Sequence, residues 1–229
     1  MSNFQIFWDQ FASGGYKNVL SGLQTTVIIA VFGLVIGFLL GCIIATIKLI
    51  PKDNIVVTIF KRLCDIYIML FRGTPMVVQL LLMHFALFPM LHINIDSVAE
   101  AVIIFGMNSA AYMAEMLRGG INAVDKGQME AGRSLGFGFT AAMLRIVLPQ
   151  AIKNILPTLG NEFIALIKET SVVGFIAVMD LTRAFQAIAN STYEFFVPYI
   201  MLALVYLVLV LLITLLIRLI ERRLAKSER

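Results

Sequence analysis

Charged residues are scarce in this sequence. Asp, Glu, Lys and Arg make up 14% of its 229 residues, whereas an average soluble domain has about 25%. Hydrophobic residues account for 60% of the chain, and its mean hydropathy is +0.92. This balance excludes an ordinary water-soluble domain and indicates an integral membrane protein.

Cysteine and histidine are rare as well, with two residues of each. Cys42 and Cys64 lie in or near apolar segments, and no CxxC or other metal-ligand spacing occurs. His84 and His92 stand alone, with Pro89 between them. We therefore expect neither a disulfide framework nor a metal site, and we expect both histidines to be packed or interfacial.

Motifs for ATP hydrolysis and for covalent catalysis are also missing. No GxxxxGK[ST] string occurs, so the sequence offers no loop to hold nucleotide phosphates. No pairing of a nucleophile with a base is visible either. We expect a non-enzymatic chain with no cofactor of its own and no nucleic-acid partner.

Long apolar runs dominate what is present. They predict five transmembrane helices in a single domain of residues 1–229, at about 23–47, 62–88, 98–117, 149–170 and 195–217. Because backbone polar groups inside a bilayer must be satisfied within the protein, we expect an all-α membrane protein. A more polar loop, 118–148, separates the third and fourth predicted spans.

Glycine and proline mark two special places in these runs. Gly33, Gly37 and Gly41 form two overlapping GxxxG motifs on one helix face, which predicts the close approach of another helix. In the second run, the string FRGTP contains Arg72 and Pro75. Proline cannot donate a backbone hydrogen bond, so a helix break is expected there, and Arg72 is expected to face protein or a water-filled cavity.

Basic residues are distributed unevenly. With the C-terminus inside, fourteen of the 18 Lys and Arg residues lie in predicted inner segments or in the C-terminal tail. The positive-inside bias therefore predicts the N-terminus outside and the C-terminus inside. It also places the loop 118–148 in the cytoplasm.

Charges recur within the fourth predicted span, at Glu162, Lys168 and Glu169. Glu162 lies thirteen residues after Pro149, which is ~20 Å along a helix and near the middle of a ~30 Å hydrocarbon core. A charge at this depth is a candidate functional site. Two interpretations stay open: the charges flank a pocket, or they form buried ion pairs with other helices, at Arg72 or Glu115.

The third predicted span carries a polar stripe of its own. Asn108, Tyr112 and Glu115 follow the i, i+4, i+7 spacing of one helix face. The stripe fits either hydrogen bonds between helices or the lining of a transport path, and the spacing alone does not separate the two.

The longest polar interruption runs from Glu130 to Pro149. Its pattern, Glu130-Ala131-Gly132, then Gly136, then Ile-x-Leu-Pro ending at Pro149, resembles the EAA loop of ATP-binding-cassette (ABC) importer permeases, with Gly132 in place of the second alanine. An ordinary inner loop would explain the charges but not this spacing. The resemblance implies a cytoplasmic coupling helix that docks on an ATPase subunit, with these residues in the contact: Glu130, Ala131, Gly132, Arg133, Ser134 and Gly136.

The resemblance extends over nearly the whole chain. The strings FRGTP, NSAAYMAE, AVDKGQMEAGRSLG and LPQAIKNILPTLGNEFIALIKETS are similar to those of permease subunits of polar amino-acid ABC importers. This implies a multi-pass protein of the bacterial plasma (inner) membrane, paired with a second permease copy or a sister permease. It also implies ATPase subunits, which hold ATP and Mg, and an extracytoplasmic substrate-binding protein.

The same resemblance implies that Glu162 and Lys168 hold the amino-acid substrate. Lys168 suits the substrate carboxylate, and Glu162 suits its ammonium group or a cationic side chain, which favours arginine or lysine. Further candidate substrate-binding residues are Thr170, Ser171, Asn108 and Arg72. The alternatives are the same machine carrying glutamine, cystine or another small polar solute, an ion-coupled secondary transporter, or a structural or assembly subunit.

Overall fold

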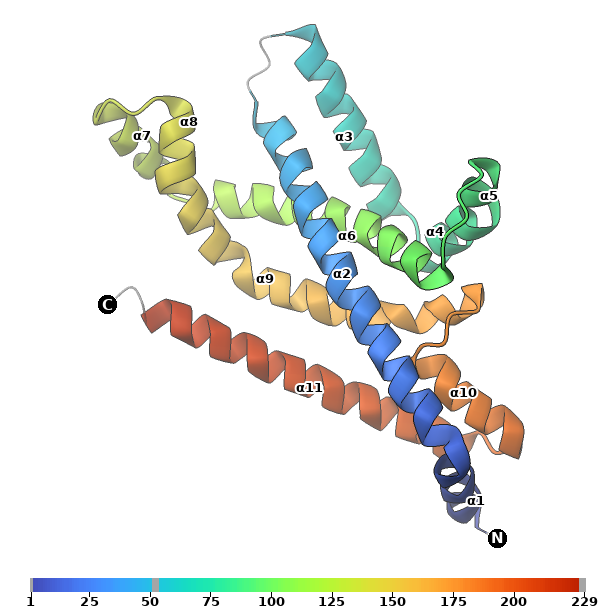
Figure 1. The fold of residues 1–229 in the computed structure, drawn as a ribbon. Helices are drawn as coiled ribbons and strands as arrows, with labels where there is room; N and C mark the ends of the chain where they lie inside the picture. The colour runs from blue at the N-terminus through green and yellow to red at the C-terminus, as the bar shows by residue number, and fades with distance from the viewer. Residues whose placement is uncertain (1, 51–53, 227–229) are drawn as a thin grey trace.

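The computed structural model describes residues 2–50 and 54–226, and within these ranges the chain is helical without strands (Figure 1). The predicted all-α fold is confirmed for this part of the chain. The helices are α1 (Asn3–Gln10), α2 (Tyr16–Leu49), α3 (Ile55–Gly73), α4 (Met76–Leu82), α5 (Phe88–Met90), α6 (Ser97–Asn122), α7 (Lys126–Ser134), α8 (Phe139–Ala142), α9 (Leu148–Glu169), α10 (Leu181–Thr192) and α11 (Phe196–Lys226). Short π-helical turns (Phe11–Gly15, Met83–Leu87, Met143–Val147) and one 3-10 helix (Thr170–Ile176) connect or extend them.

The glycine stripe of α2 packs against α6, as the GxxxG spacing predicts. Gly33, Gly37 and Gly41 are all buried. A Cβ atom added to Gly37 would lie 2.6 Å from the Cβ of Ser109 in α6, which is closer than real Cβ atoms approach. The two backbones are therefore in a contact that a larger residue would not allow.

The order of the contacts between α2 and α6 gives the relative direction of these two helices. Gly33 faces Phe105 and Gly41 faces Met113. The residue numbers rise together along the two helices, so α2 and α6 run parallel.

The two later long helices alternate in direction. On α9, the neighbours of α6 fall in reverse order, because Gly120 meets Ile155 whereas Ser109 meets Glu162. On α11, Ile217 packs on Gly160 while Tyr206 interacts with Thr170. Hence α9 is antiparallel to α6, and α11 runs parallel to α2 and α6, as Figure 1 also shows.

The break predicted in FRGTP is confirmed. The helix axis bends by 109° between α3 and the segment Met76–Met90. Thr74 is extended, with φ −123° and ψ 145°, because a following proline disfavours the helical conformation. The side-chain amide of Gln79 stabilises the break by donating to the carbonyl oxygens of Phe71 (2.8 Å) and Thr74 (2.9 Å).

Three stretches of the described chain are long and apolar enough to cross a membrane, namely Asn3–Leu49, Ser97–Asn122 and Phe196–Arg223. A fourth crossing results if α3 and the bent segment Met76–Met90 act as one span. The fourth predicted span, α9, is richer in polar residues and does not qualify by composition alone. Five crossings therefore remain a prediction.

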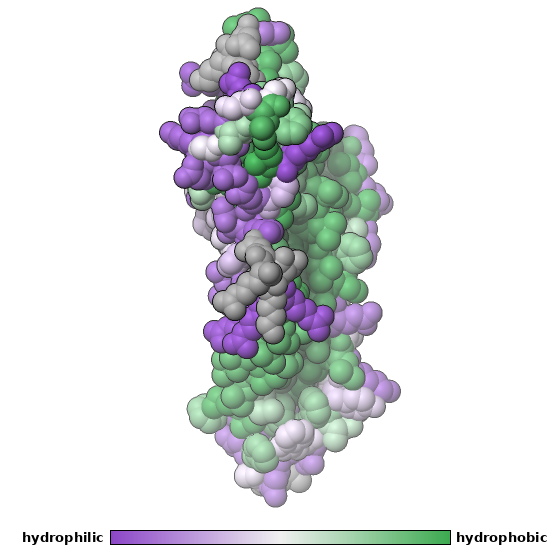
Figure 2. All heavy atoms as spheres, turned by 90° about the vertical axis from the view of Figure 1, so that its left-hand side faces the viewer, coloured by the Kyte–Doolittle hydropathy of each residue, from purple (hydrophilic) through white to green (hydrophobic). Residues whose placement is uncertain are grey.

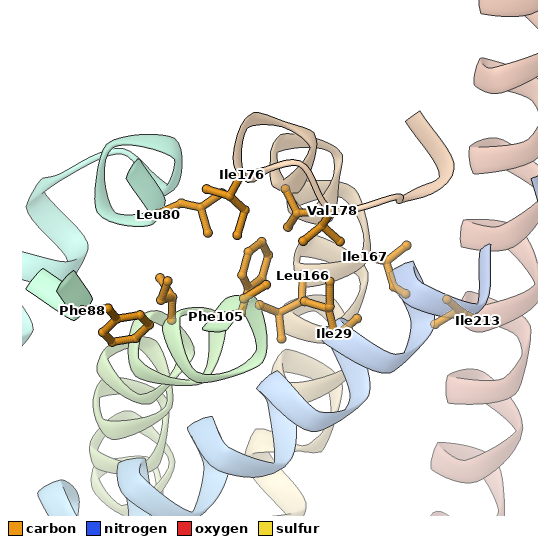
Figure 3. Packing of buried hydrophobic residues seen from close by; sticks show 13 residues of the cluster. Ile29, Leu80, Phe88, Phe105, Leu166, Ile167, Ile176, Val178 and Ile213 are labelled. Atoms are coloured by element: carbon orange, nitrogen blue, oxygen red, sulfur yellow. The ribbon is translucent and has the colours of Figure 1, made fainter. Parts of the chain in front are cut away.

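The main hydrophobic cluster lies where α2, α4, α6, α9 and the 3-10 helix meet (Figure 3). Phe105 of α6 is fully buried in it. Figure 3 places Leu80 and Ile176 on one side of this ring and Ile29 and Leu166 on another. The cluster fixes the relative positions of the helices that carry the candidate site residues.

The outer helices leave broad apolar faces uncovered. In its most hydrophobic stretch α6 is 61% buried, whereas α11 is 11% buried. Hence α6 is the central helix, and the exposed face of α11 suits lipid or a partner subunit. Figure 2, which views the end bearing α7 and α8, shows hydrophilic residues gathered there beside a continuous hydrophobic face.

Candidate functional site

Glu162 is the most notable charged residue of α9. Its side chain is half-buried, and its Oε1 accepts a hydrogen bond of 3.0 Å from the Oγ of Ser109. Ser109 is fully buried and lies midway along α6. Glu162 therefore lies beside the middle of α6, a helix long enough to cross a membrane.

No cation lies within ion-pair distance of Glu162 among the side chains that the structure describes, in residues 2–50 and 54–223. A half-buried carboxylate without a counter-charge is unfavourable in a medium of low dielectric constant. The arrangement can therefore accept a cationic group of a ligand, with Ser109 holding one carboxylate oxygen.

Lys168 and Glu169 occupy the end of α9 and are both exposed. After Glu169 the α-helix narrows into the 3-10 helix Thr170–Ile176. Lys168 forms no ion pair within the described ranges. Its ammonium group is thus available to a carboxylate from outside the chain.

Arg72 belongs to a different set of charges. This set joins α2, α3 and α6 and consists of Lys48, Asp65, Arg72, Glu115 and Arg118. Glu115 is its centre, with carboxylate oxygens 2.6 Å from Arg118, 3.2 Å from Lys48 and 3.8 Å from Arg72. The guanidinium of Arg72 also lies 5.4 Å from the centre of the Tyr112 ring. Arg72 thus contacts Glu115 and Tyr112 rather than Glu162.

Asn108 and Thr170 make contacts that hold the fold together. The Nδ2 of Asn108 donates to the Oε1 of Gln79 at 2.9 Å and to the carbonyl of Phe71 at 3.3 Å. Asn108 therefore braces the break between α3 and α4. Thr170 is fully buried, and its hydroxyl donates to the carbonyl of Ile167 at 2.7 Å.

Ser171 faces a separate space. It lines a cavity of about 390 Å³ together with Asp180, Thr182 and Arg183. Burial raises the pKa of the Asp180 carboxyl, although the backbone N–H groups of Thr182 and Arg183 donate to it. The predicted substrate residues thus make several different kinds of contact, and Glu162 is the one hydrogen-bonded to the centre of α6.

The sequence alone did not indicate the contact partners of three residues, namely Ser109, Gln79 and His84. Ser109 follows Asn108 in the string NSAAYMAE of the third predicted span, but the polar stripe does not include it. Gln79 is a lone amide four residues after Pro75 in an apolar run, a signal that could have identified it. His84 contacts the buried carboxylate of Glu100 through its Nδ1, in a cavity of about 520 Å³.

The EAA-like stretch forms the short helix α7 and the turn after it. Asp125 caps α7 by accepting a 2.6 Å hydrogen bond from the N–H of Gly127. Gly132 is buried, and a Cβ added there would meet the Cδ1 of Ile146 at 2.6 Å. Gly136 adopts φ +86°, which favours glycine. The first glycine and the isoleucine of the motif are therefore packed together, and the second glycine makes the turn.

The opposite side of α7 is open. Glu130, Ala131, Arg133 and Ser134 are exposed. Just beyond the helix, Leu135 is 79% exposed, which is unusual for a large apolar side chain next to a packed helix. The exposed residues present a compact mixed surface that suits contact with another protein.

Comparison with known proteins agrees with these features. Residues 37–226 match the family described as "Binding-protein-dependent transport system inner membrane component". The arginine transport system permease protein ArtQ of Bacillus subtilis (strain 168) is 40% identical over 92% of this chain and 94% of its own length. The putative glutamine transport system permease protein GlnP of Rickettsia bellii (strain RML369-C) is 41% identical over 92% and 93%. A crystal structure of an amino acid ABC transporter with histidines superimposes with a TM-score of 0.82 at 42% identity, covering 91% of this chain and 94% of that one.

Proposed function

The chain belongs to the family of inner membrane components of binding-protein-dependent transport systems, and on this premise we propose that it is the permease subunit of an ATP-driven importer of a basic amino acid. It is a multi-pass protein of the inner membrane. The ATPase of such a system is a separate chain, so this subunit supplies the path and not the hydrolysis.

Helix directions support five crossings, with the N-terminus outside and the C-terminus inside. Because α2 and α6 run parallel, we infer that the segment between them returns across the membrane, and this supports α3 with Met76–Met90 as one crossing. The antiparallel α9 and the following α11 add the fourth and fifth. The basic C-terminal end of α11 then lies on the inner side, in agreement with the charge bias.

The preference for a basic amino acid depends on Glu162. The observation that supports it is the half-buried Glu162 carboxylate, which accepts a hydrogen bond from Ser109 in the middle of α6. No cation pairs with this carboxylate in the described chain. Arginine or lysine would bring the missing positive charge, and Lys168 is placed to meet the substrate carboxylate in the assembled transporter. Sequence identity does not distinguish between the substrates, since the relatives named for arginine and glutamine transport are 40% and 41% identical to this chain.

Coupling to ATP hydrolysis is assigned to α7. In the proposed topology it follows the inner end of α6, and its exposed face carries Glu130 and Arg133. ATPase subunits on the cytoplasmic side would press on this face and move α6 and α9 through the packed contact of Gly132 with Ile146. A second permease copy or a sister permease, and an extracytoplasmic binding protein, complete the assembly.

The test is ATP-dependent uptake of labelled arginine, lysine, glutamine and cystine by vesicles that hold this chain with its ATPase and binding protein. Glu162→Gln should abolish most uptake of arginine and lysine and affect glutamine far less, because the amide removes the negative charge. Glu169→Gln, an exposed carboxylate seven residues further on, is the matched control. Equal losses for all substrates would refute the assigned role of Glu162, and uptake driven by an ion gradient without ATP would refute the importer.

A further inference from the structure

A polar cavity of about 370 Å³ lies where α2 ends and α3 begins, at the upper ends of these helices in Figure 1. Its lining residues are Lys48 from α2 and Thr58, Lys61, Arg62 and Asp65 from α3. The α3 residues follow a spacing of three and four and therefore share one helix face. Three cations and one carboxylate thus surround a space large enough for a phosphate headgroup.

The lining carries uncompensated positive charge. Lys48 lies 3.0 Å from Asp65 and 3.2 Å from Glu115, so its charge is paired. Lys61 donates to the carbonyl of Ile50 and forms no ion pair among the residues that the structure describes. Arg62 is exposed and forms no ion pair in the part of the chain that the structure describes. Two positive charges, on Lys61 and Arg62, are left to attract an anion.

The faces of α3 that point away from the cavity are apolar. On α3, side chains interleaved with the lining residues are about half exposed, namely Ile59 (52%), Phe60 (52%), Leu63 (55%) and Ile66 (48%). Leu39 and Ile43 of the neighbouring α2 are 59% and 56% exposed. A molecule with its anionic head on the two cations would lay its hydrocarbon chains over the flank of α3 that carries Ile59 and Ile66, because each part then meets its complement.

We propose that this cavity binds the headgroup phosphate of an anionic phospholipid in the inner leaflet, with the acyl chains lying along α3. Basic pockets between membrane helices on the cytoplasmic side recognise such headgroups. The choice of leaflet depends on the topology in the proposed function, whereas the binding itself does not.

Bound lipid would hold α3 in place. Cys64 and Ile68 are the only buried residues among the 19 of α3, so packing alone holds this helix weakly. Headgroup contacts to Lys61 and Arg62 would add to the Lys48–Asp65 ion pair and stabilise the position of α3 beside α2.

The experiment is native mass spectrometry of the purified permease–ATPase complex titrated with phosphatidylglycerol or with phosphatidylcholine of the same chains. The wild-type complex should retain phosphatidylglycerol with a preference of roughly tenfold, since each basic residue near the surface contributes to anionic lipid binding. Lys61→Gln with Arg62→Gln should bring the preference close to unity, and Lys61→Arg alone should preserve it.

Control variants keep the outcome decisive. Arg222→Gln with Arg223→Gln removes the same charge from exposed positions of the tail and should retain the preference; an equal loss there would overturn a specific site. Displacement of the lipid by excess inorganic phosphate would assign the cavity to a soluble anion and overturn the proposal. If the double variant does not assemble, Arg62→Gln alone serves, because this side chain forms no ion pair in the described part of the chain. The measurement does not depend on transport. The lipid proposal can therefore fail while the proposed function holds, and the proposed function can fail while the lipid proposal holds.

Discussion

Ser109 donates a 3.0 Å hydrogen bond to Glu162, and this contact joins the middle of α6 to α9. The same serine lies under Gly37 of α2, whose added Cβ would be 2.7 Å from the serine Oγ. One side chain therefore meets two helices. The position of the Glu162 carboxylate depends on how closely α2 and α6 approach.

Replacing Ser109 by alanine should weaken uptake of arginine. The change leaves one oxygen of Glu162 without its donor, and a hydrogen bond to a charged group contributes about 1.5–3 kcal/mol. If the carboxylate must be held for substrate binding, the KM for arginine should rise by at least about tenfold. The measurement is initial rate against arginine concentration in proteoliposomes. Ser191→Ala removes a hydroxyl that bonds only within α10 and should leave KM unchanged, whereas an unchanged KM in Ser109→Ala would contradict the role assigned to this contact.

Replacing Gly37 by alanine should destabilise the protein through the α2–α6 contact. The new methyl group would lie 2.6 Å from the Cβ of Ser109 and 3.2 Å from the backbone nitrogen of Ala110. Overpacking of this kind costs about 1–3 kcal/mol. A lower Tm of the purified complex is expected. Gly119→Ala is the matched control, because nothing lies within 4 Å of the added Cβ; a Tm that falls equally in both variants would show that the close approach is unimportant.

The glycine stripe of α2 and the break between α3 and α4 show which structural features can be predicted from sequence. The GxxxG stripe of α2 predicts a close helix contact, and the string FRGTP predicts a break, because small residues and proline act locally. Neither pattern identifies the residues that the stripe or the break contacts. That Gly37 meets Ser109, and that Gln79 closes the break, depends on helices that are distant in sequence.

The polar stripe of the third span illustrates the same limit. Asn108 and Glu115 share a face of α6, yet Asn108 bonds with Gln79 and Glu115 pairs with Lys48 and Arg118. Periodicity gives the face of a helix but not the residues opposite it, and the 109° bend after α3 decides those. The sequence could therefore propose Glu162 as a candidate from its estimated depth, but it could not identify Ser109 as the hydrogen-bond partner.

Asn108→Ala tests whether Asn108 braces the fold or contacts substrate. The side chain donates to Gln79 at 2.9 Å, and its loss leaves a buried acceptor unsatisfied at a cost of about 1–3 kcal/mol. As a brace, Asn108 should lower Tm and reduce the maximal uptake of arginine, lysine and glutamine by similar factors. Gln79→Leu should have the same effect, and the double variant should be less harmful than the sum. A change confined to the KM of one substrate, with Tm preserved, would instead make Asn108 a substrate-binding residue.

Gly136→Ala should reduce the coupling between ATP hydrolysis and transport. Gly136 has φ +86°, and a residue with a Cβ is strained in the left-handed region by about 1–2 kcal/mol. Nothing lies within 4 Å of the added Cβ, so the effect would come from the backbone of the turn after α7 and not from a clash. A distorted turn should displace the exposed face with Glu130, and the number of ATP molecules hydrolysed per arginine transported should rise while membrane insertion stays normal. Gly138→Ala, also in open space but with φ −64°, should keep the wild-type ratio. If both variants transport with the wild-type ratio, the turn does not position the coupling face, and Glu130→Arg becomes the remaining test of α7 as the contact with the ATPase.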